Sequence, residues 1–241
     1  MLEGVVFESE GERLLGRFYR ADGEGPRPTL VIAHGIAGVE LNLDLADALR
    51  DAGWNVLTFH YRGCWGSGGV YRVRTLKADV AAAVAWALAQ PTVDPHRLVL
   101  LGYSMGGWAA VGAAVEDPRI YALITLSAVS DLRAWTPTEA MLADWVRFMH
   151  GMTPEALREE LAALAEGPQP VDLVDRLSPR PLLIVHGTAD PVVPHRQSLA
   201  LHHRAGLNTD LALIDGGDHR YTGRRRVLIQ RIQQWLERIC R

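Results

Sequence analysis

The sequence predicts an α/β fold in which a mostly parallel sheet carries helices on both faces. Short apolar segments alternate with helical patterns of about 10–15 residues, the order typical of strand–helix–strand units. Several of these segments, such as residues 29–33 and 182–186, are apolar without interruption, as expected of strands buried on both faces. The chain has 241 residues, 48% of them hydrophobic, so we expect a single domain over residues 1–241.

Eight segments fit strands, in chain order 4–7, 14–19, 29–33, 55–60, 97–102, 122–127, 181–186 and 210–214. The first two have no helix between them, and Gly11 and Glu12 supply a turn, so we expect an antiparallel hairpin at the sheet edge. Apolar residues recur at helical spacing in residues 45–52, 80–88 and 228–239. These three segments are predicted helices.

Residues 131–178 interrupt this alternation with an insertion after the sixth strand. They separate two predicted strands by more residues than a simple crossover needs, and they contain helical patterns at 138–149 and 154–165. Apolar side chains crowd the first pattern, which is compatible with an ordinary core helix. Long insertions of this kind are often lids over a site, and we therefore expect a cap.

Composition excludes several classes of protein. The net charge of −3, from 28 acidic residues against 25 lysines and arginines, argues against a nucleic-acid partner. The sequence has no uncharged run of about 18 apolar residues, so no membrane span is expected, and the first residues lack the apolar stretch of a signal peptide. Cys64 and Cys240 are too far apart for a CxxC site, so we expect two free thiols and a cytoplasmic location.

The segment Gly102-Tyr103-Ser104-Met105-Gly106 has the G-x-S-x-G pattern of a nucleophile elbow. It follows a predicted strand and precedes a helical run, which is the context that such an elbow requires. Glycine at the flanking positions removes side chains that would clash in so tight a turn. The alternative is a glycine-rich strand–helix turn without chemistry.

A serine nucleophile needs a general base, and the base needs a carboxylate that orients it. His219 stands in a loop between the last predicted strand and the last helix, and Asp190 follows the strand at 181–186. Taken singly, His219 could be a surface histidine and Asp190 a turn residue before Pro191. Asp131, which follows the sixth strand, is the alternative acid.

The oxyanion of an acyl-transfer reaction needs two N–H donors. The amide of Met105, the residue after the nucleophile, is the first candidate. The second is the amide of Ile36, because the glycines in His34-Gly35-Ile36-Ala37-Gly38 let the backbone come close to a ligand. His34 itself is interpreted as a structural residue.

These four segments occur in the chain order serine, aspartate, histidine, with the oxyanion loop first, and each follows a predicted strand. Together with the glycine-rich stretch at 61–68, they resemble the α/β-hydrolase family over nearly the whole chain. Within that family the sequence is similar to small esterases of the cinnamoyl-esterase and dienelactone-hydrolase type. The resemblance implies an eight-stranded sheet with an antiparallel second strand, and a cap formed by residues 131–178.

The sequence departs from two groups of this family, which makes their activities less expected here. Dienelactone hydrolases carry a cysteine nucleophile where this chain has Ser104. Peptidases of the prolyl-oligopeptidase type usually have HGGP in the first loop, whereas this chain has HGIAG, which weakens the peptidase interpretation.

We therefore expect a serine hydrolase that cleaves small acyl or aryl carboxylic esters through an acyl-enzyme. The predicted catalytic residues are Ser104, Asp190 and His219, with Ile36 and Met105 as oxyanion donors. An apolar substrate pocket is expected from the cap residues Trp135, Met141, Trp145 and Met149.

Several alternatives stay open at this stage. A peptidase or amidase, a thioesterase, and a non-catalytic binding module would all suit the same fold. No cofactor or metal is expected: the chain has no HExxH motif, and adjacent His202 and His203 cannot share a helix face. The expected partner is a small ester, without nucleic acid or membrane, and the final helix or the cap offers a surface for a homodimer.

Overall fold

The computed structural model describes residues 1–240. In this range the chain forms one eight-stranded sheet, with strands β1 (Leu2–Ser9), β2 (Glu12–Tyr19), β3 (Arg27–Ala33), β4 (Asn55–Phe59), β5 (Val93–Tyr103), β6 (Ala122–Leu126), β7 (Leu182–Gly187) and β8 (Thr209–Ile214). All eight predicted strands are present, most of them extended by one to four residues at an end.

The strands are arranged in the order β1-β2-β4-β3-β5-β6-β7-β8. β2 runs antiparallel to both of its neighbours, β1 and β4, and every pair from β4 to β8 is parallel. The expected hairpin is present, with Gly11 at its turn in a left-handed conformation (φ 82°). The eight-stranded sheet with its antiparallel second strand confirms the predicted α/β-hydrolase fold.

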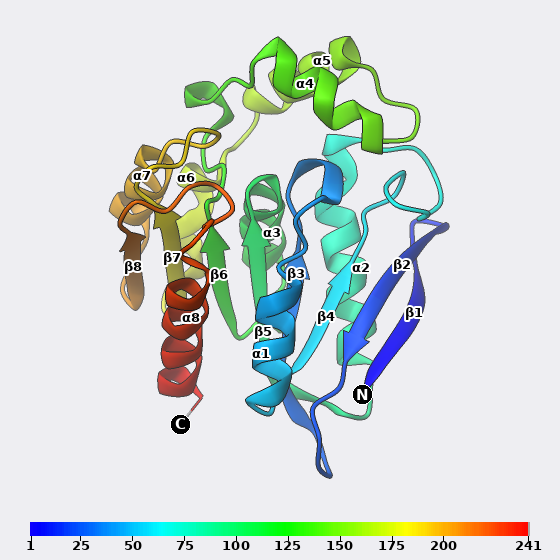
Figure 1. Cartoon of the computed structure of the whole chain (residues 1–241), viewed down its shortest axis with the longest axis vertical. Coiled ribbons are helices and arrows are strands. Elements are labelled where there is room, and N and C mark those ends of the chain that lie inside the picture. The colour runs from blue at the N-terminus through cyan, green and yellow to red at the C-terminus, as the bar shows by residue number, and fades with distance from the viewer. Residues whose placement is uncertain (241) are drawn as a thin grey trace.

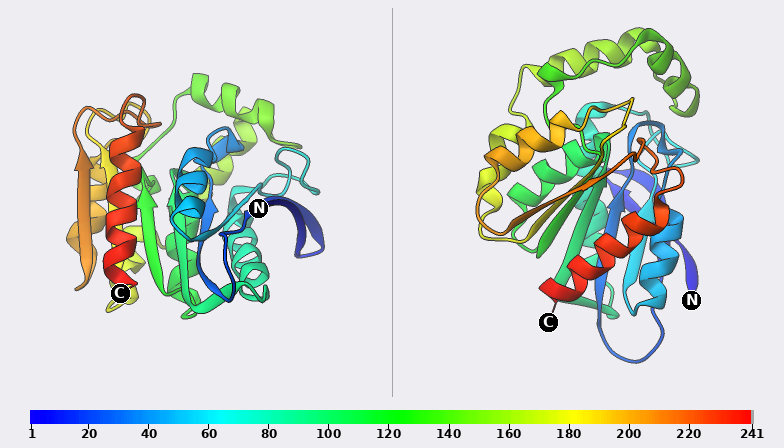
Figure 2. Two further views of the ribbon diagram at one scale, coloured as in Figure 1. Left: turned by 60° about the horizontal axis from the view of Figure 1, so that its bottom comes forward. Right: turned by 60° about the vertical axis from the view of Figure 1, so that its left-hand side comes forward.

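Helices cover both faces of the sheet (Figures 1 and 2). On one face, α2 (Leu76–Leu88) and α3 (Met105–Glu116) pack on a core cluster that includes Val31 of the central strand β3. On the other face, α1 (Leu43–Asp51) and α8 (Arg225–Ile239) pack on a second cluster that includes Leu30 and Ile32. Alternate residues of β3 thus enter opposite cores, which explains why this strand is apolar at every inner position.

The segment between β6 and β7 contains most of the remaining helices. They are the 3-10 turns η3 (Leu132–Ala134), η4 (Val146–Phe148) and η5 (Val174–Leu177), and the helices α4 (Glu139–Trp145), α5 (Pro154–Ala165) and α6 (Pro170–Leu173). In Figure 1, α4 and α5 lie above the carboxyl ends of the parallel strands. The helical pattern expected at 138–149 ends earlier, at Trp145, and continues as a 3-10 turn.

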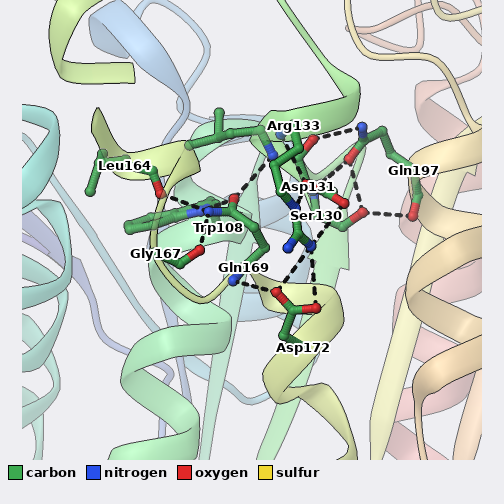
Figure 3. Close-up of polar contacts among 10 residues, drawn as sticks. Trp108, Ser130, Asp131, Arg133, Leu164, Gly167, Gln169, Asp172 and Gln197 are labelled. Carbon is green, nitrogen blue, oxygen red and sulfur yellow. Dashed lines mark hydrogen bonds and ion pairs between the residues drawn. The ribbon is translucent and has the colours of Figure 1, made fainter. Parts of the chain in front are cut away.

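Two buried glutamines hold the ends of this segment (Figure 3). Gln169 accepts hydrogen bonds from the Leu132 amide (3.0 Å) and from the indole of Trp108 on α3 (3.2 Å). Its amide nitrogen donates to the carbonyls of Leu164 and Gly167, at 2.7 and 2.9 Å. A single side chain therefore fixes the end of the insertion to its beginning and to the helix that follows Ser104.

Gln197 of α7 (Arg196–Arg204) forms a similar set of bonds at the start of the insertion. Its side-chain oxygen accepts from the amides of Ser130 and Asp131, both at 2.8 Å, and its nitrogen donates to the Asp131 carbonyl at 3.0 Å. Since Gln197 is buried, these bonds give its side-chain oxygen and nitrogen the partners that buried polar atoms require. The base of the insertion is consequently tied to the body of the domain.

Candidate active site

The backbone at Ser104 is strained. Ser104 links β5 to α3 with φ 54° and ψ −122°, an uncommon conformation for a residue with a side chain. A Cβ atom on Gly106 would lie 2.2 Å from the Ala33 carbonyl oxygen, and one on Gly102 would lie 2.5 Å from the Gly106 oxygen. Only glycine fits at these positions, so the elbow glycines predicted from the sequence are required by the packing.

Ser104 lies at a cavity of about 310 Å³ at the carboxyl edge of the sheet. His219 lines the same cavity, and so does Ile36 of the oxyanion loop. The rest of the wall consists of Gly35, Ala37, Val39, Glu40, Tyr103, Asp144, Trp145, Pro191, Val192, Asp218 and Arg220. The structure thus brings together four loops and the end of α4 around this cavity.

Asp190 and His219 form a hydrogen-bonded pair, with 2.7 Å between Asp190 Oδ2 and His219 Nδ1. The other carboxylate oxygen, Oδ1, accepts from the amides of Val192 (2.8 Å) and Val193 (2.9 Å). His186 adds a further contact, with its Nε2 3.2 Å from Asp190 Oδ2. The carboxylate is buried, yet each of its oxygens has a partner.

These contacts set the charge of Asp190. Burial by itself would raise the pKa of the carboxyl group, but the hydrogen bonds from His186, His219 and the Val193 amide together hold that pKa well below its usual range. Asp190 is therefore ionised at neutral pH. Because Asp190 accepts at Nδ1, His219 carries its proton there and keeps Nε2 free as a base.

Tyr103, inside the elbow, also supports His219. Its hydroxyl donates to the His219 carbonyl at 3.1 Å, and the two ring centroids lie 5.0 Å apart. No hydrogen bond joins Ser104 to His219 within residues 1–240, although both line one cavity. Catalytic hydrogen bonds often tighten only when a substrate is bound.

The loop after β3, which contains the expected oxyanion donor Ile36, comes very close to Ser104. A Cβ on Gly35 would lie 2.8 Å from the Ser104 Cβ, so glycine is needed there. Ile36 begins the 3-10 turn η1 (Ile36–Gly38) and Met105 begins α3, so neither amide has a partner within its own helix. The N-terminus of α3 adds its positive dipole end at the same place.

His34 orients the Ile36 amide. Its Nδ1 donates to the Gly35 carbonyl at 2.6 Å, while its Nε2 accepts from the Tyr61 amide at 3.3 Å. Burial lowers the pKa of His34 to about 3, so the ring is neutral, as this arrangement requires. The Gly35 carbonyl and the Ile36 N–H belong to one planar trans peptide, so fixing the carbonyl toward His34 aims the N–H the opposite way.

The four residues of the insertion that were expected to line the pocket have different positions. Trp145 lines the cavity beside Ser104. Trp135 is buried, stacks on Trp145 at 6.2 Å and donates its indole N–H to the Val192 carbonyl at 2.7 Å. Met141 packs on the core, and Met149 lines a separate cavity next to the glycine-rich loop.

Asp131, the alternative acid, is engaged elsewhere. Its carboxylate accepts from the Arg133 amide at 2.9 Å and pairs with the Arg133 guanidinium at 2.8 Å. It therefore caps η3 at the base of the insertion, while Asp190 is the carboxylate in contact with His219.

Sequence reasoning missed His186 and Gln169. His186 lies at the end of β7, and its contact with Asp190 four residues later depends on the turn that follows this strand. Within residues 1–240 there is no group of three or more histidine, cysteine or acidic side chains suited to a metal ion. Cys64 and Cys240 are free thiols. No helix in the described part of the chain has the length and apolar character needed to cross a membrane.

Comparison with known families gives one match that covers most of the chain. A family model described as the prolyl oligopeptidase family matches residues 43–241. Among curated proteins, the uncharacterized protein Rv2307c of Mycobacterium tuberculosis is 30% identical over 223 residues, covering 89% of this chain and 71% of that protein. The uncharacterized protein YfhR of Escherichia coli is also 30% identical over 223 residues, covering 90% of this chain and 73% of YfhR.

Solved structures show the same fold. The α/β hydrolase GrgF from Penicillium sp. superposes with a TM-score of 0.80 at 21% identity, covering 99% of this chain and 98% of GrgF. Est1E from Butyrivibrio proteoclasticus, solved with ferulic acid bound, has a TM-score of 0.79 at 23% identity, covering 98% of this chain and 100% of Est1E.

Proposed function

Because the chain belongs to the prolyl oligopeptidase family and has the α/β-hydrolase fold, we propose that it is a serine hydrolase acting on small carboxylic esters. The observation that carries this proposal is the ionised Asp190 bonded to His219 at 2.7 Å, on the same cavity as the strained Ser104. An acid, a base and a nucleophile that meet at a helix N-terminus suit acyl transfer.

In the proposed reaction, Ser104 Oγ attacks the ester carbonyl carbon and its proton moves to His219 Nε2. The N–H groups of Ile36 and Met105 stabilise the negative oxygen of the tetrahedral intermediate. The intermediate collapses as the C–O bond to the alcohol breaks, and the leaving oxygen takes the proton from His219. Water then attacks the acyl-enzyme, giving its proton to His219, and the carboxylic acid leaves as Ser104 Oγ regains that proton.

The size and lining of the cavity favour a small acyl or aryl ester. Its volume of about 310 Å³ is near the lower end of ligand sites, and Ile36, Trp145 and Val192 provide apolar walls. Est1E, which has the same fold, was solved with ferulic acid bound. Ferulic acid is an aromatic carboxylic acid, the kind of acyl group that an aryl ester of this proposal would carry. The segment 131–178 contributes Trp145 to the cavity and, in this proposal, acts as a cap that limits the acyl group.

Hydrolysis of p-nitrophenyl esters of increasing chain length tests the proposal. Wild type is expected to cleave the short esters, and Ser104→Ala to lose at least about 10³-fold in kcat. His219→Gln should lose as much, whereas His203→Gln, on the exposed face of α7, should keep full activity. Ester cleavage that persists in Ser104→Ala would contradict the proposal.

The family match favours one alternative, hydrolysis of a peptide or amide bond, because the same three groups catalyse both reactions. Matched p-nitrophenyl ester and p-nitroanilide substrates with the same acyl group separate the two. A kcat/KM for the anilide equal to or above that for the ester would move the assignment to an amidase.

A further inference from the structure

Trp65 is a half-exposed aromatic residue with an unusually short polar contact. It lies in the glycine-rich loop after β4, with 48% of its surface exposed and a positive φ of 50°. Its indole N–H donates to the carbonyl of Ala37 at 2.6 Å. Because so much of the side chain is exposed, burial does not explain a tryptophan at this position. The hydrogen bond to Ala37 is the contact that indicates its function.

The acceptor of this bond lies in the oxyanion loop. Ala37 has φ 69° and ψ −13°, a left-handed conformation that residues with a side chain rarely adopt. Gly38, which follows, also has a positive φ of 63°, and its amide donates to the Gly35 carbonyl at 3.2 Å. The turn that carries the Ile36 N–H is thus strained, and such turns persist only where neighbours hold them.

The turn is held from two sides. On the inner side, His34 binds the Gly35 carbonyl at 2.6 Å from within the core. On the outer side, Trp65 binds the Ala37 carbonyl at 2.6 Å and packs against Gly38, where a Cβ would lie 3.1 Å from the indole Cδ1. The outer contact comes from a residue that also touches the cap.

Trp65 reaches the cap through Phe148 of η4. The two rings stack with centroids 5.3 Å apart and an angle of 14° between their planes. Main-chain bonds fix the same two segments together, since the His150 amide donates to the Gly63 carbonyl at 2.7 Å and the Tyr71 amide to the His150 carbonyl at 3.0 Å. Any displacement of this end of the cap is therefore transmitted to the Trp65 ring.

We propose that Trp65 is a positioning residue that holds the oxyanion loop in its active conformation and couples it to the cap through Phe148. When the cap is seated, the indole N–H keeps the Ala37 carbonyl in place and the Ile36 N–H stays aimed at the cavity. When the cap moves away, this outer support is lost. The oxyanion site is then complete only under a closed cap, a statement that rests on the proposed hydrolase function.

The test removes the indole N–H while keeping an aromatic ring. Trp65→Phe is expected to lower kcat on p-nitrophenyl butyrate by about tenfold with KM changed less than about twofold, a fraction of the loss when an oxyanion donor is deleted. Trp235→Phe is the matched control, because it also loses an indole hydrogen bond, to Asp210 Oδ2 at 2.9 Å, but on α8. A kcat of Trp65→Phe within twofold of wild type overturns the proposal.

Hydrogen exchange supplies a readout that does not depend on turnover. The Gly38 amide reports the loop conformation, and its exchange is expected to accelerate at least about tenfold in Trp65→Phe and also in Phe148→Ala, but not in Trp235→Phe. Unchanged exchange in Trp65→Phe overturns the positioning role, and unchanged exchange in Phe148→Ala overturns the coupling to the cap. If wild type cleaves no ester, the hydrolase proposal fails, while the exchange experiment still decides the role of Trp65.

Discussion

At the level of single residues, the conformation of Ser104 depends on glycines, because neighbouring atoms occupy the space that a side chain at these positions would need. Gly102 is the sharpest case, because a Cβ there would lie 2.5 Å from the Gly106 oxygen and 2.6 Å from the Ala110 Cβ. Distances below 3 Å require the chain to move. A substitution at this position therefore acts on the elbow itself.

We predict that Gly102→Ala lowers the free energy of unfolding by about 2–3 kcal/mol and removes most hydrolytic activity, because the elbow must shift. Gly112→Ala is the control from the same helix, α3. A Cβ there meets only the flexible Lys77 side chain, at 3.3 Å, so we expect no loss of activity and a gain of up to about 1 kcal/mol. Urea unfolding and ester assays measure both; equal stabilities for the two variants would refute the argument.

The residues of the site could be predicted where a short sequence motif identifies them. The G-x-S-x-G pattern predicted Ser104, and the order of motifs predicted Asp190 and His219, which the structure places 2.7 Å apart. Trp65 was not predicted, because its contact with Ala37 spans 28 residues and depends on two loops meeting above neighbouring strands. The contacts of the insertion could not be predicted either, since a helical pattern shows which residues are apolar but not what they face.

At the scale of elements, the strands were predicted well and the insertion less completely. Unbroken apolar runs identify strands buried on both faces, and all eight were placed near their observed bounds. The helix expected at 138–149 ends at Trp145, because the backbone tightens into a 3-10 turn before Met149 pairs with Cys64. That pairing is a tertiary contact, which local periodicity does not encode.

The insertion depends on Gln169, which satisfies four separate groups at its base. We predict that Gln169→Leu, similar in size, lowers the free energy of unfolding by about 3 kcal/mol, because it leaves the buried Leu132 amide without its partner and removes the bonds to the part-buried carbonyls of Leu164 and Gly167. KM should rise as well, since the insertion, which contributes Trp145 to the cavity, loses its fixed base.

The control is Gln230→Leu, on the exposed face of α8, which should change stability by less than about 0.5 kcal/mol. Urea unfolding and KM for a short ester measure both variants. Equal, small effects at the two positions would show that the glutamine does not hold the insertion.

At the scale of the whole molecule, two neutral histidines make stability depend on pH. Burial lowers the pKa of His34 to about 3 and that of His60 to about 4, from 6.5. Below pH 6.5 the unfolded chain takes up protons at these rings and the folded chain does not. Stability therefore falls as the pH decreases from 6.5 toward 4, by up to about 1.4 kcal/mol per pH unit for each histidine.

We predict that the free energy of unfolding is lower at about pH 5 than at about pH 7, and that His34→Gln reduces this difference. His203→Gln, which replaces an exposed histidine on α7, should leave it unchanged. Asp190 does not contribute in this range. Its pKa is lowered in the folded chain, so the unfolded chain takes up more protons at this group, and stability is lost, only as the pH falls below the ordinary aspartate pKa of 3.8. A wild-type stability that stays constant between the two pH values would contradict the account.

We propose that Ser104 is a nucleophile activated by His219 and Asp190, and covalent labelling tests this proposal without knowledge of the substrate. A fluorophosphonate reacts with an activated serine and adds a defined mass to the intact protein. We predict one adduct per chain, located on the peptide that contains Ser104, absent in Ser104→Ala and formed at least about 10³-fold more slowly in His219→Gln. Labelling at another residue, or equal labelling of wild type and Ser104→Ala, would contradict the claim.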